Sequence, residues 1–271
     1  MSRKERSRAA MALRVPTGLV LLLSLAYAGA ALALSYRNDI GFVAAARQLP
    51  GKIPAAAARA WGWVVGPSGR VIVFDGNSLT AGRAVEPGER YPARCLALLG
   101  PGWEGHNLGV SSQTTGDMLA DADREVDRLA RGRSPVLVAW EVTNDIYFGA
   151  AAGEAFARFA DYCRGRRAAG YQVVVLTVLP RNDFPGTSRL PEPQKAEHEA
   201  RRREVNRLLR AGWAEFADAL ADVAADDRLG DDGDELDRRY YADKVHLTPE
   251  GYRIVAGHVA EALRRLPAPG E

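Results

Sequence analysis

The chain has 271 residues, of which 47% are hydrophobic and 26% charged, an ordinary globular composition with enough apolar residues for one sizeable core. Its formal net charge of +2 includes a basic cluster in residues 1–14, so the remainder is slightly acidic and does not favour nucleic acid as a partner. Cys95 and Cys163 are too few for a disulfide framework and form no C-x-x-C pair, so we expect buried thiols rather than a zinc site.

The amino-terminal segment carries an uncharged apolar run. No charged residue lies between Arg14 and Arg37, and this stretch has about the ~20 residues of a membrane-spanning helix, more than the ~7 to 15 of a signal-peptide core. Residues 31–33 have the A-x-A pattern of a cleavage site, so a cleaved signal is the alternative. We therefore expect residues 1–37 to form a basic cytoplasmic end plus a transmembrane anchor or signal segment. The rest of the protein would then be extracytoplasmic and membrane-anchored, or secreted if the segment is cleaved.

Residues 38–69 are rich in alanine and interrupted by proline and glycine, which indicates a linker before the main domain, residues 70–271. In that domain, strand-like apolar runs alternate with amphipathic helical segments. The predicted strands are 71–74, 135–140, 172–179 and 220–223, and the predicted helices are 91–99, 118–131, 154–169, 193–216 and 249–265. This alternation predicts an α/β domain whose helices cover both faces of a parallel sheet. The loops after successive strands then gather at one edge of the sheet.

The first strand runs into a small polar turn, VIVFDGNSLTAG, residues 71–82. The glycine that closes it is not followed by lysine, so it is not a phosphate-binding loop, and the spacing of its glycines does not fit the nucleophile elbow of α/β-hydrolases. A magnesium-dependent phosphatase of the haloacid dehalogenase type would use Asp75 as nucleophile, but Asn77 replaces its second aspartate. Ser78 therefore has two interpretations: a residue that caps the following helix, or the nucleophile of a serine hydrolase.

The last polar turn contains an acid and a base at a useful spacing. Asp243 lies three residues before His246, and Thr248 and Pro249 then begin a helix. A carboxylate at this spacing can reach the imidazole Nδ1, fix the tautomer and leave Nε2 free as a base. A surface ion pair is the alternative for an isolated Asp-x-x-His. A serine at the end of another strand favours the catalytic interpretation.

Four short blocks, FDGNSLT, NLGVSS, VTND and DKVHLT, follow one another along the chain. In this order, over about residues 71–267, they resemble the SGNH hydrolases, also called the GDSL esterase/lipase family. The resemblance implies a flavodoxin-like three-layer α/β/α sandwich with a five-stranded parallel sheet. It implies Ser78 as nucleophile, His246 as general base and Asp243 as the acid that orients the histidine. It also implies an oxyanion hole from the backbone N–H groups of Ser78 and Gly109 and the side-chain amide of Asn144, with no metal or cofactor.

The chain departs from the family's motifs at two places. The usual Gly-Asp-Ser is Gly-Asn-Ser here, with Asn77 before the serine. The usual Gly-x-Asn-Asp is Val-Thr-Asn-Asp, with Val142 where glycine lets the backbone turn closely. The second departure bears on the position of Asn144, but neither removes a catalytic group.

The expected activity is hydrolysis of a carboxylic ester through an acyl-enzyme. Location and resemblance suggest small acyl groups, such as acetyl, on cell-envelope glycans, with lipid esters as another substrate class and the membrane as a partner of the amino-terminal helix. An acyltransferase, or a lipase or thioesterase of the same fold, is the alternative. The Asp75 phosphatase and a non-catalytic binding module are further alternatives. We expect no catalytic role for His106, His198 or His258, and we place His198 on a solvated helix face.

Overall fold

The computed structural model describes residues 70–130, 134–182 and 193–267. The predicted anchor or signal segment, residues 1–37, and the predicted linker, residues 38–69, lie outside the described residues. Within the described ranges, no helix is both long and apolar enough to cross a membrane.

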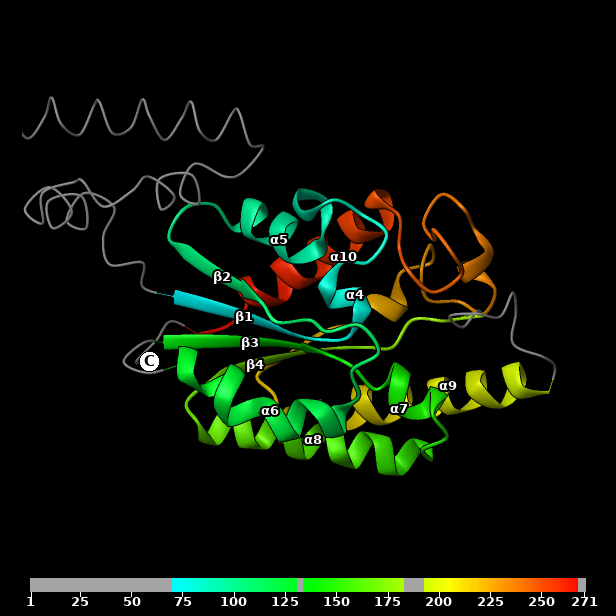
Figure 1. Ribbon diagram of the computed structural model, residues 1–271, viewed down its shortest axis with the longest axis horizontal. Helices are drawn as coiled ribbons and strands as arrows, with labels where there is room; N and C mark the ends of the chain where they lie inside the picture. The colour runs from blue at the N-terminus through cyan, green and yellow to red at the C-terminus, as the bar shows by residue number, and fades with distance from the viewer. Residues whose placement is uncertain (1–69, 131–133, 183–192, 268–271) are drawn as a thin grey trace, which may run out of the picture. The chain divides into compact units, whose positions relative to one another are not determined.

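Five parallel strands form one sheet (Figure 1). They are β1 (Arg70–Gly76), β2 (Trp103–Asn107), β3 (Ser134–Trp140), β4 (Gln172–Leu176) and β5 (Ala219–Ala221). Their order in the sheet is β2-β1-β3-β4-β5, so the direction of winding reverses between β1 and β3. In open α/β sheets the crevice at the carboxyl ends of the strands flanking such a reversal is the usual ligand site.

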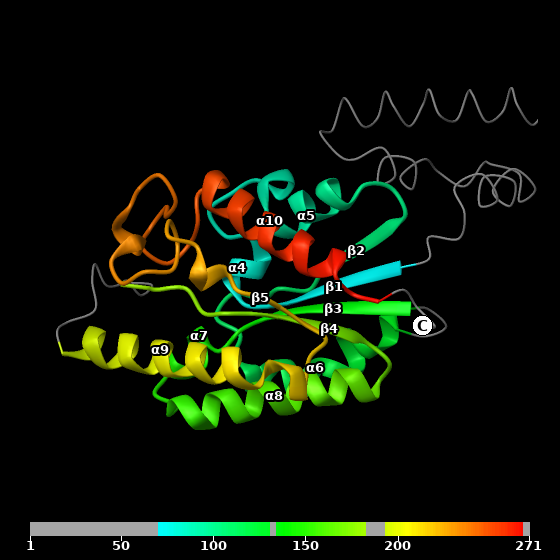
Figure 2. The ribbon, with the colours of Figure 1, turned by 180° about the vertical axis from the view of Figure 1, so that it is seen from behind.

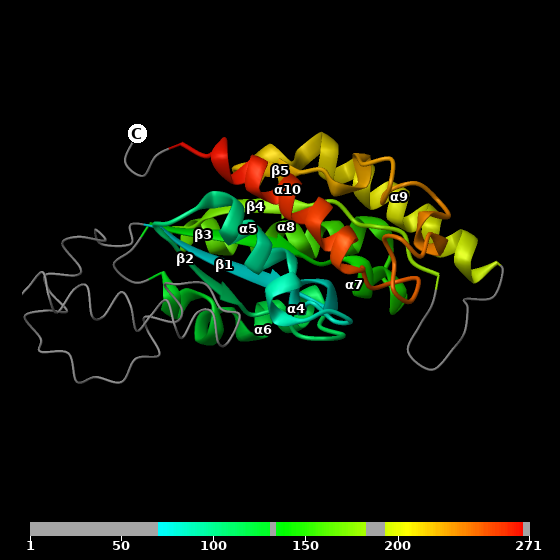
Figure 3. The ribbon, with the colours of Figure 1, turned by 90° about the horizontal axis from the view of Figure 1, so that it is seen from above.

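Helices cover both faces of the sheet, which is the predicted three-layer arrangement. Figures 1 and 2 show α5 (Tyr91–Leu99) and α10 (Pro249–Arg264) on one face, and α6 (Thr115–Glu125), α8 (Ala152–Ala168) and α9 (Gln194–Gly212) on the other. Two short helices, α4 (Ser78–Ala81) and α7 (Thr143–Tyr147), follow β1 and β3 directly. Figure 3 shows both at the same end of the sheet, where the carboxyl ends of the strands lie.

The side chains of the central strand β1 alternate between two apolar cores. Ile72 and Phe74 pack into the core under α5 and α10, whereas Val71 and Val73 pack into the core under α6 and α8. All four are fully buried, which explains the continuous apolar run at the start of the domain. A β1 strand held from both faces provides a rigid base for the turn that follows it.

Cys95 and Cys163 are free and buried, as their number and spacing predict. Burial raises the pKa of the Cys95 thiol to about 12, and it also raises the pKa of Cys163. Both thiols therefore stay protonated at neutral pH and act as small core residues.

The long predicted elements are confirmed, and most of their ends shift by a few residues. Helix α5 begins and ends where predicted, but α9 ends at Gly212, before a short 3₁₀ turn, and β4 ends at Leu176. The sequence does not predict α4 or α7, because segments of four and five residues are too short to show helical periodicity. These two unpredicted helices begin in the turns that carry Ser78 and Asn144.

Candidate active site

The turn after β1 places Ser78 at the start of α4. Gly76 has a φ of +150°, and a Cβ there would lie 2.2 Å from the backbone oxygen of Trp140, so only glycine lets β1 pass so close to the end of β3. The side chain of Asn77 caps the helix, with Oδ1 accepting from the Leu79 N–H at 2.8 Å. Ser78 thus occupies the first turn of α4, where backbone N–H groups have no acceptor within the helix.

The turn before α10 holds His246. It is closed by the Ala242 N–H, which donates to the His246 carbonyl at 2.7 Å. Within it, Oδ1 of Asp243 accepts from the backbone N–H of His246 at 2.8 Å and from that of Val245 at 3.2 Å. The carboxylate therefore organises the backbone of its own turn while its second oxygen stays available for the imidazole.

Ser78, His246 and Asp243 form one hydrogen-bonded line. The Ser78 Oγ lies 2.9 Å from His246 Nε2, and His246 Nδ1 lies 2.7 Å from Asp243 Oδ2. Burial raises the pKa of Asp243, but the hydrogen bonds from His246 outweigh it and hold that pKa at about 2. The ionised Asp243 accepts from Nδ1–H of His246, so in the neutral imidazole Nε2 is the nitrogen that accepts from the serine hydroxyl.

The turn after β2 brings Gly109 against α4. A Cβ at Gly109 would lie 2.3 Å from the backbone nitrogen of Ala81, so this close approach requires glycine. Asn107 ties the two segments together, because its Nδ2 donates to the Thr80 carbonyl at 2.8 Å and its Oδ1 accepts from the Gly109 N–H at 3.0 Å. The predicted oxyanion donor Gly109 thus lies beside α4, with its N–H directed to Asn107 in this structure.

Asn144 lies in the first turn of α7, and its amide has a fixed orientation. Its Nδ2 donates to the Gln113 carbonyl at 2.8 Å, and its Oδ1 accepts from Arg181 Nη1 at 3.1 Å. The Gln113 side chain in turn donates to Asp75 Oδ1 at 3.2 Å. These contacts use the amide oxygen and one of the two amide hydrogens, which leaves the second hydrogen for another acceptor.

Val142, at the position where the motif usually has glycine, has a positive φ. Its φ is +90°, a region that β-branched residues rarely enter, and its side chain is fully buried. The departure from glycine therefore places a valine in a strained backbone conformation. Val142 is nevertheless the N-cap residue of α7, and its carbonyl accepts from the Ile146 N–H at 3.1 Å.

Glu141 is a site residue that the sequence interpretation missed. It is 1% exposed, its Oε2 accepts from Asn77 Nδ2, and its Oε1 accepts from the Asn144 backbone N–H at 3.0 Å. The carboxylate thereby joins the turns after β1 and β3. Burial and the nearby Asp145 carboxylate raise its pKa well above the usual range. The available signal was a charged residue directly after the six apolar residues of a buried strand.

Asp75 is unsuited to the phosphatase alternative. Its Oδ2 accepts from the Tyr162 hydroxyl at 2.5 Å, and its Oδ1 accepts from Gln113 and from the Gly76 N–H. It is 3% exposed, and burial raises its pKa to about 6. With both oxygens engaged and shielded, this carboxylate lacks the accessible oxygen of a nucleophile.

The other histidines have different surroundings. His106 lies 3.1 Å from a Glu104 oxygen, and His258 lies 3.0 Å from an Asp226 oxygen. The prediction that His198 lies on a solvated helix face is wrong, because it is 5% exposed and burial lowers its pKa. Its charged neighbours in the sequence indicated a solvated face, but His198 lies on a buried face of α9.

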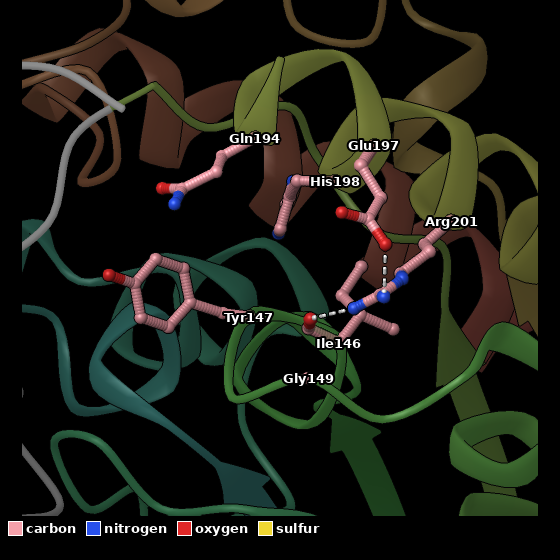
Figure 4. A pocket seen from close by; sticks show the side chains of 7 residues that line it. All are labelled: Ile146, Tyr147, Gly149, Gln194, Glu197, His198 and Arg201. Atoms are coloured by element: carbon pink, nitrogen blue, oxygen red, sulfur yellow. Dashed lines mark hydrogen bonds and ion pairs between the residues drawn. The ribbon is translucent and has the colours of Figure 1, made fainter. Parts of the chain in front are cut away.

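Pockets are lined by the short helices α4 and α7, which carry Ser78 and Asn144. One, of about 360 Å³, lies between α7 and α9, and Figure 4 shows Tyr147 and His198 on its walls. Its Arg201 binds Glu197 and donates to the Ile146 carbonyl. The other, of about 520 Å³, is lined by the end of α4 and by Gly109. A third pocket, of about 430 Å³, shares Gly109 and Asn107 with the second and adds Leu108 and Val110 to its walls.

A serine, a histidine and an aspartate in one hydrogen-bonded line at a sheet edge form the arrangement of a serine hydrolase. The sequence profile of the GDSL-like lipase/acylhydrolase family matches residues 74–254 of this chain. The chain belongs to this family, the SGNH hydrolases, and is a serine hydrolase of the esterase/lipase type.

Solved structures share the fold at low sequence identity. A lipolytic protein of the G-D-S-L family from Veillonella parvula is 20% identical, with a TM-score of 0.56 over 73% of this chain and 100% of the other. The aryl esterase of M. smegmatis is 18% identical, with a TM-score of 0.54 over 73% and 100% of the two chains. A carbohydrate acetylesterase from Sinorhizobium meliloti is 18% identical, with a TM-score of 0.51 over 72% and 98%. No curated protein matches the chain.

Proposed function

We propose that Ser78, His246 and Asp243 hydrolyse a carboxylic ester through an acyl-enzyme. The observation that carries this proposal is the 2.9 Å contact between Ser78 Oγ and His246 Nε2. A neutral hydroxyl is a poor nucleophile, so His246 removes its proton as the oxygen attacks the ester carbonyl. His246 then protonates the departing alcohol, and a water molecule repeats the attack to release the acid.

The oxyanion of each tetrahedral intermediate is stabilised by three donors: the Ser78 and Gly109 N–H groups and the Asn144 amide. Asn144 supports this role because its amide is oriented by Gln113 and Arg181 with one hydrogen remaining. The Gly109 N–H must leave its contact with Asn107 or share its hydrogen with the substrate oxygen. Such donors stabilise charge that develops chiefly in the transition state.

The substrate that we favour is a small acyl ester, such as acetyl, on a cell-envelope glycan. The pockets lined by α4 and α7 include charged side chains in their walls, which suits a polar alcohol better than a long acyl chain. One protein that shares the fold is a carbohydrate acetylesterase, which supports an acetyl ester of a carbohydrate by analogy. The predicted location outside the cytoplasm is consistent with the same substrate.

The test uses the full-length protein with p-nitrophenyl acetate, butyrate and octanoate, and with O-acetylated polysaccharides. We expect turnover to fall with acyl length and acetate to be released from the polysaccharide. A fluorophosphonate should label wild-type protein but not Ser78→Ala. Unlabelled wild-type protein would contradict the assignment of Ser78 and favour a binding module. Added alcohol acceptors would reveal an acyltransferase by the formation of a new ester.

We also propose that the protein is anchored by residues 15–36 with its hydrolase domain outside the cytoplasm. The support is the uncharged apolar run after a basic segment. The full-length protein should stay with membranes in high salt, because apolar burial rather than charge holds it there. Protease added to intact cells should digest the domain. Complete protection with an intact amino terminus would overturn this topology.

A further inference from the structure

The 520 Å³ pocket begins at the proposed nucleophile helix. Its walls include Ala81 and Gly82 at the end of α4, together with Gly109 and Asn107 from the turn after β2. Ser78 is the first residue of α4, and Gly109 is one of the proposed oxyanion donors. The pocket thus shares Gly109 and helix α4 with the proposed active site.

Two arginines on the pocket wall have no acidic partner. Among the described residues, neither Arg83 nor Arg90 has a carboxylate within 4.0 Å, and the Nε of Arg90 is buried without a hydrogen-bond partner. Most arginines of the domain are instead paired, as Arg201 is with Glu197 in the pocket between α7 and α9. A buried guanidinium N–H without an acceptor costs free energy unless a ligand accepts its hydrogen bond.

Gly82 positions one of these arginines. A Cβ at Gly82 would lie 2.2 Å from Cγ of Arg90, so the side-chain stem of Arg90 crosses the space that any other residue would fill. Gly82 also has a φ of +76°, which glycine adopts without strain, and it ends α4. The Arg90 side chain therefore packs against the carboxyl end of α4, the helix that begins with Ser78.

We propose that this pocket binds a negatively charged group, a carboxylate or a phosphate, on the alcohol half of the ester. Two guanidinium groups match the oxygens of such groups in charge and in the geometry of their N–H donors. The Asn107 amide and the Ser111 hydroxyl add neutral polar groups to the same wall. The inference rests on the proposed function, because a small acyl group on Ser78 leaves the alcohol half to occupy the pocket.

The test compares 4-acetoxybenzoate and 4-acetoxyphenyl phosphate with the neutral methyl 4-acetoxybenzoate. The measured quantity is the ratio of kcat/KM for each charged ester to that for the neutral ester, which removes differences in folding and in active-enzyme content. We expect Arg83→Gln and Arg90→Gln each to lower this ratio about tenfold. The ratio in the wild-type protein should also fall as NaCl is raised, because salt screens the attraction.

A matched control is Arg164→Gln on α8. Arg164 is exposed and pairs with Asp161 at 2.7 Å on the opposite face of the sheet, so its loss removes one charge without touching the pocket. We expect its ratio to equal that of the wild-type protein. In Arg83→Gln and Arg90→Gln, a larger fall in the kcat/KM ratio for one of the two charged esters would identify its group, carboxylate or phosphate, as the one that the pocket binds.

The possible failures are distinguishable. Hydrolysis of the neutral ester with ratios unchanged in both pocket variants would overturn the anionic subsite alone. Wild-type protein that hydrolyses none of the three esters would contradict the proposed function instead. If Arg90→Gln does not fold, the exposed Arg83 still decides the outcome.

Discussion

The two sides of the proposed site differ in the exposure of their carboxylates and in their relation to the family's motifs. On the side of the base, neither Asp243 nor His246 departs from the family's motifs, and the Asp243 side chain is 49% exposed although His246 is buried. On the side of the oxyanion, Val142 departs from the usual glycine, and Glu141 and Asn144 are 1% and 6% exposed. The base side relies on one short turn, whereas the oxyanion side relies on contacts between segments far apart in the sequence.

This difference shows how the departures are accommodated. An aspartate at position 77, as in the usual motif, would place a second carboxylate against buried Glu141, and like charges in a buried site resist ionisation. Asn77 instead donates to Glu141 while its oxygen caps α4. On the oxyanion side, therefore, one departure from the motif forms part of a network of complementary hydrogen bonds.

The largest effect should follow loss of the nucleophile or the base. We expect Ser78→Ala and His246→Ala each to lower kcat/KM for p-nitrophenyl acetate by on the order of 10⁴-fold or more, because each removes half of the proton-transfer pair. Melting temperatures should stay close to that of the wild-type protein. Near-native turnover in either purified variant would refute the assignment.

On the oxyanion side, Asn144→Ala should lower kcat by about 10²-fold to 10³-fold, equivalent to about 2.7 to 4 kcal/mol. KM should change less, because the amide is aimed at charge that is present chiefly in the transition state. Steady-state kinetics on p-nitrophenyl acetate measure both constants. A rise in KM by a similar factor, with kcat unchanged, would place Asn144 outside the oxyanion hole.

The hydrogen bond between Asn77 and Glu141 can be tested by exchanging the amide and the carboxylate between the two positions. Glu141→Gln presents too few acceptors to the Asn77 amide and the Asn144 N–H, so we expect kcat to fall about tenfold, with lower stability. In the double variant Asn77→Asp/Glu141→Gln, a carboxylate and an amide again face each other, and Gln oxygen can accept from Asn144. Kinetics and melting temperature should recover in the double variant. Additive losses would show that Glu141 does not act through this pair.

The two sides should also respond oppositely to acid. The folded-state pKa of Asp243, about 2, lies below its ordinary value, so its contribution to stability is present above about pH 4 and is lost as pH falls toward 2. Glu141 has a raised pKa, so its contribution is most favourable below its ordinary pKa and declines as pH rises. Denaturation profiles of the wild-type protein, Asp243→Asn and Glu141→Gln should separate the two contributions. Exposure and solvent screening make the Asp243 effect modest.

The smallest effect concerns Val142. Glycine would relieve a backbone conformation that costs about 1 to 3 kcal/mol, but it would lose valine burial worth about 1.5 to 3 kcal/mol. We therefore expect Val142→Gly to have nearly unchanged stability and kcat. Val142→Ala keeps the strained backbone and loses two methyl groups, so it should be the least stable of the three. A clear rise in kcat for Val142→Gly would show that valine obstructs the site.

Much of the fold was accessible from local patterns in the sequence. Continuous apolar runs and helical periodicity report burial within one segment, so β1, β3, α5 and α10 could be predicted directly. The spacing of Asp243 and His246 likewise lies within one turn, and the structure shows their contact at 2.7 Å. Residues that depend only on near neighbours in the chain are predictable in this way.

Contacts between distant segments required the tertiary structure. Glu141 meets Asn77 only because β1 and β3 are adjacent and in a register that pairs Gly76 with Trp140. The inward position of His198, among charged neighbours on α9, depends on which face of that helix packs on α7 and α8. No local period encodes such contacts, because the free energy that favours them arises only when separate strands and helices bury their polar groups together.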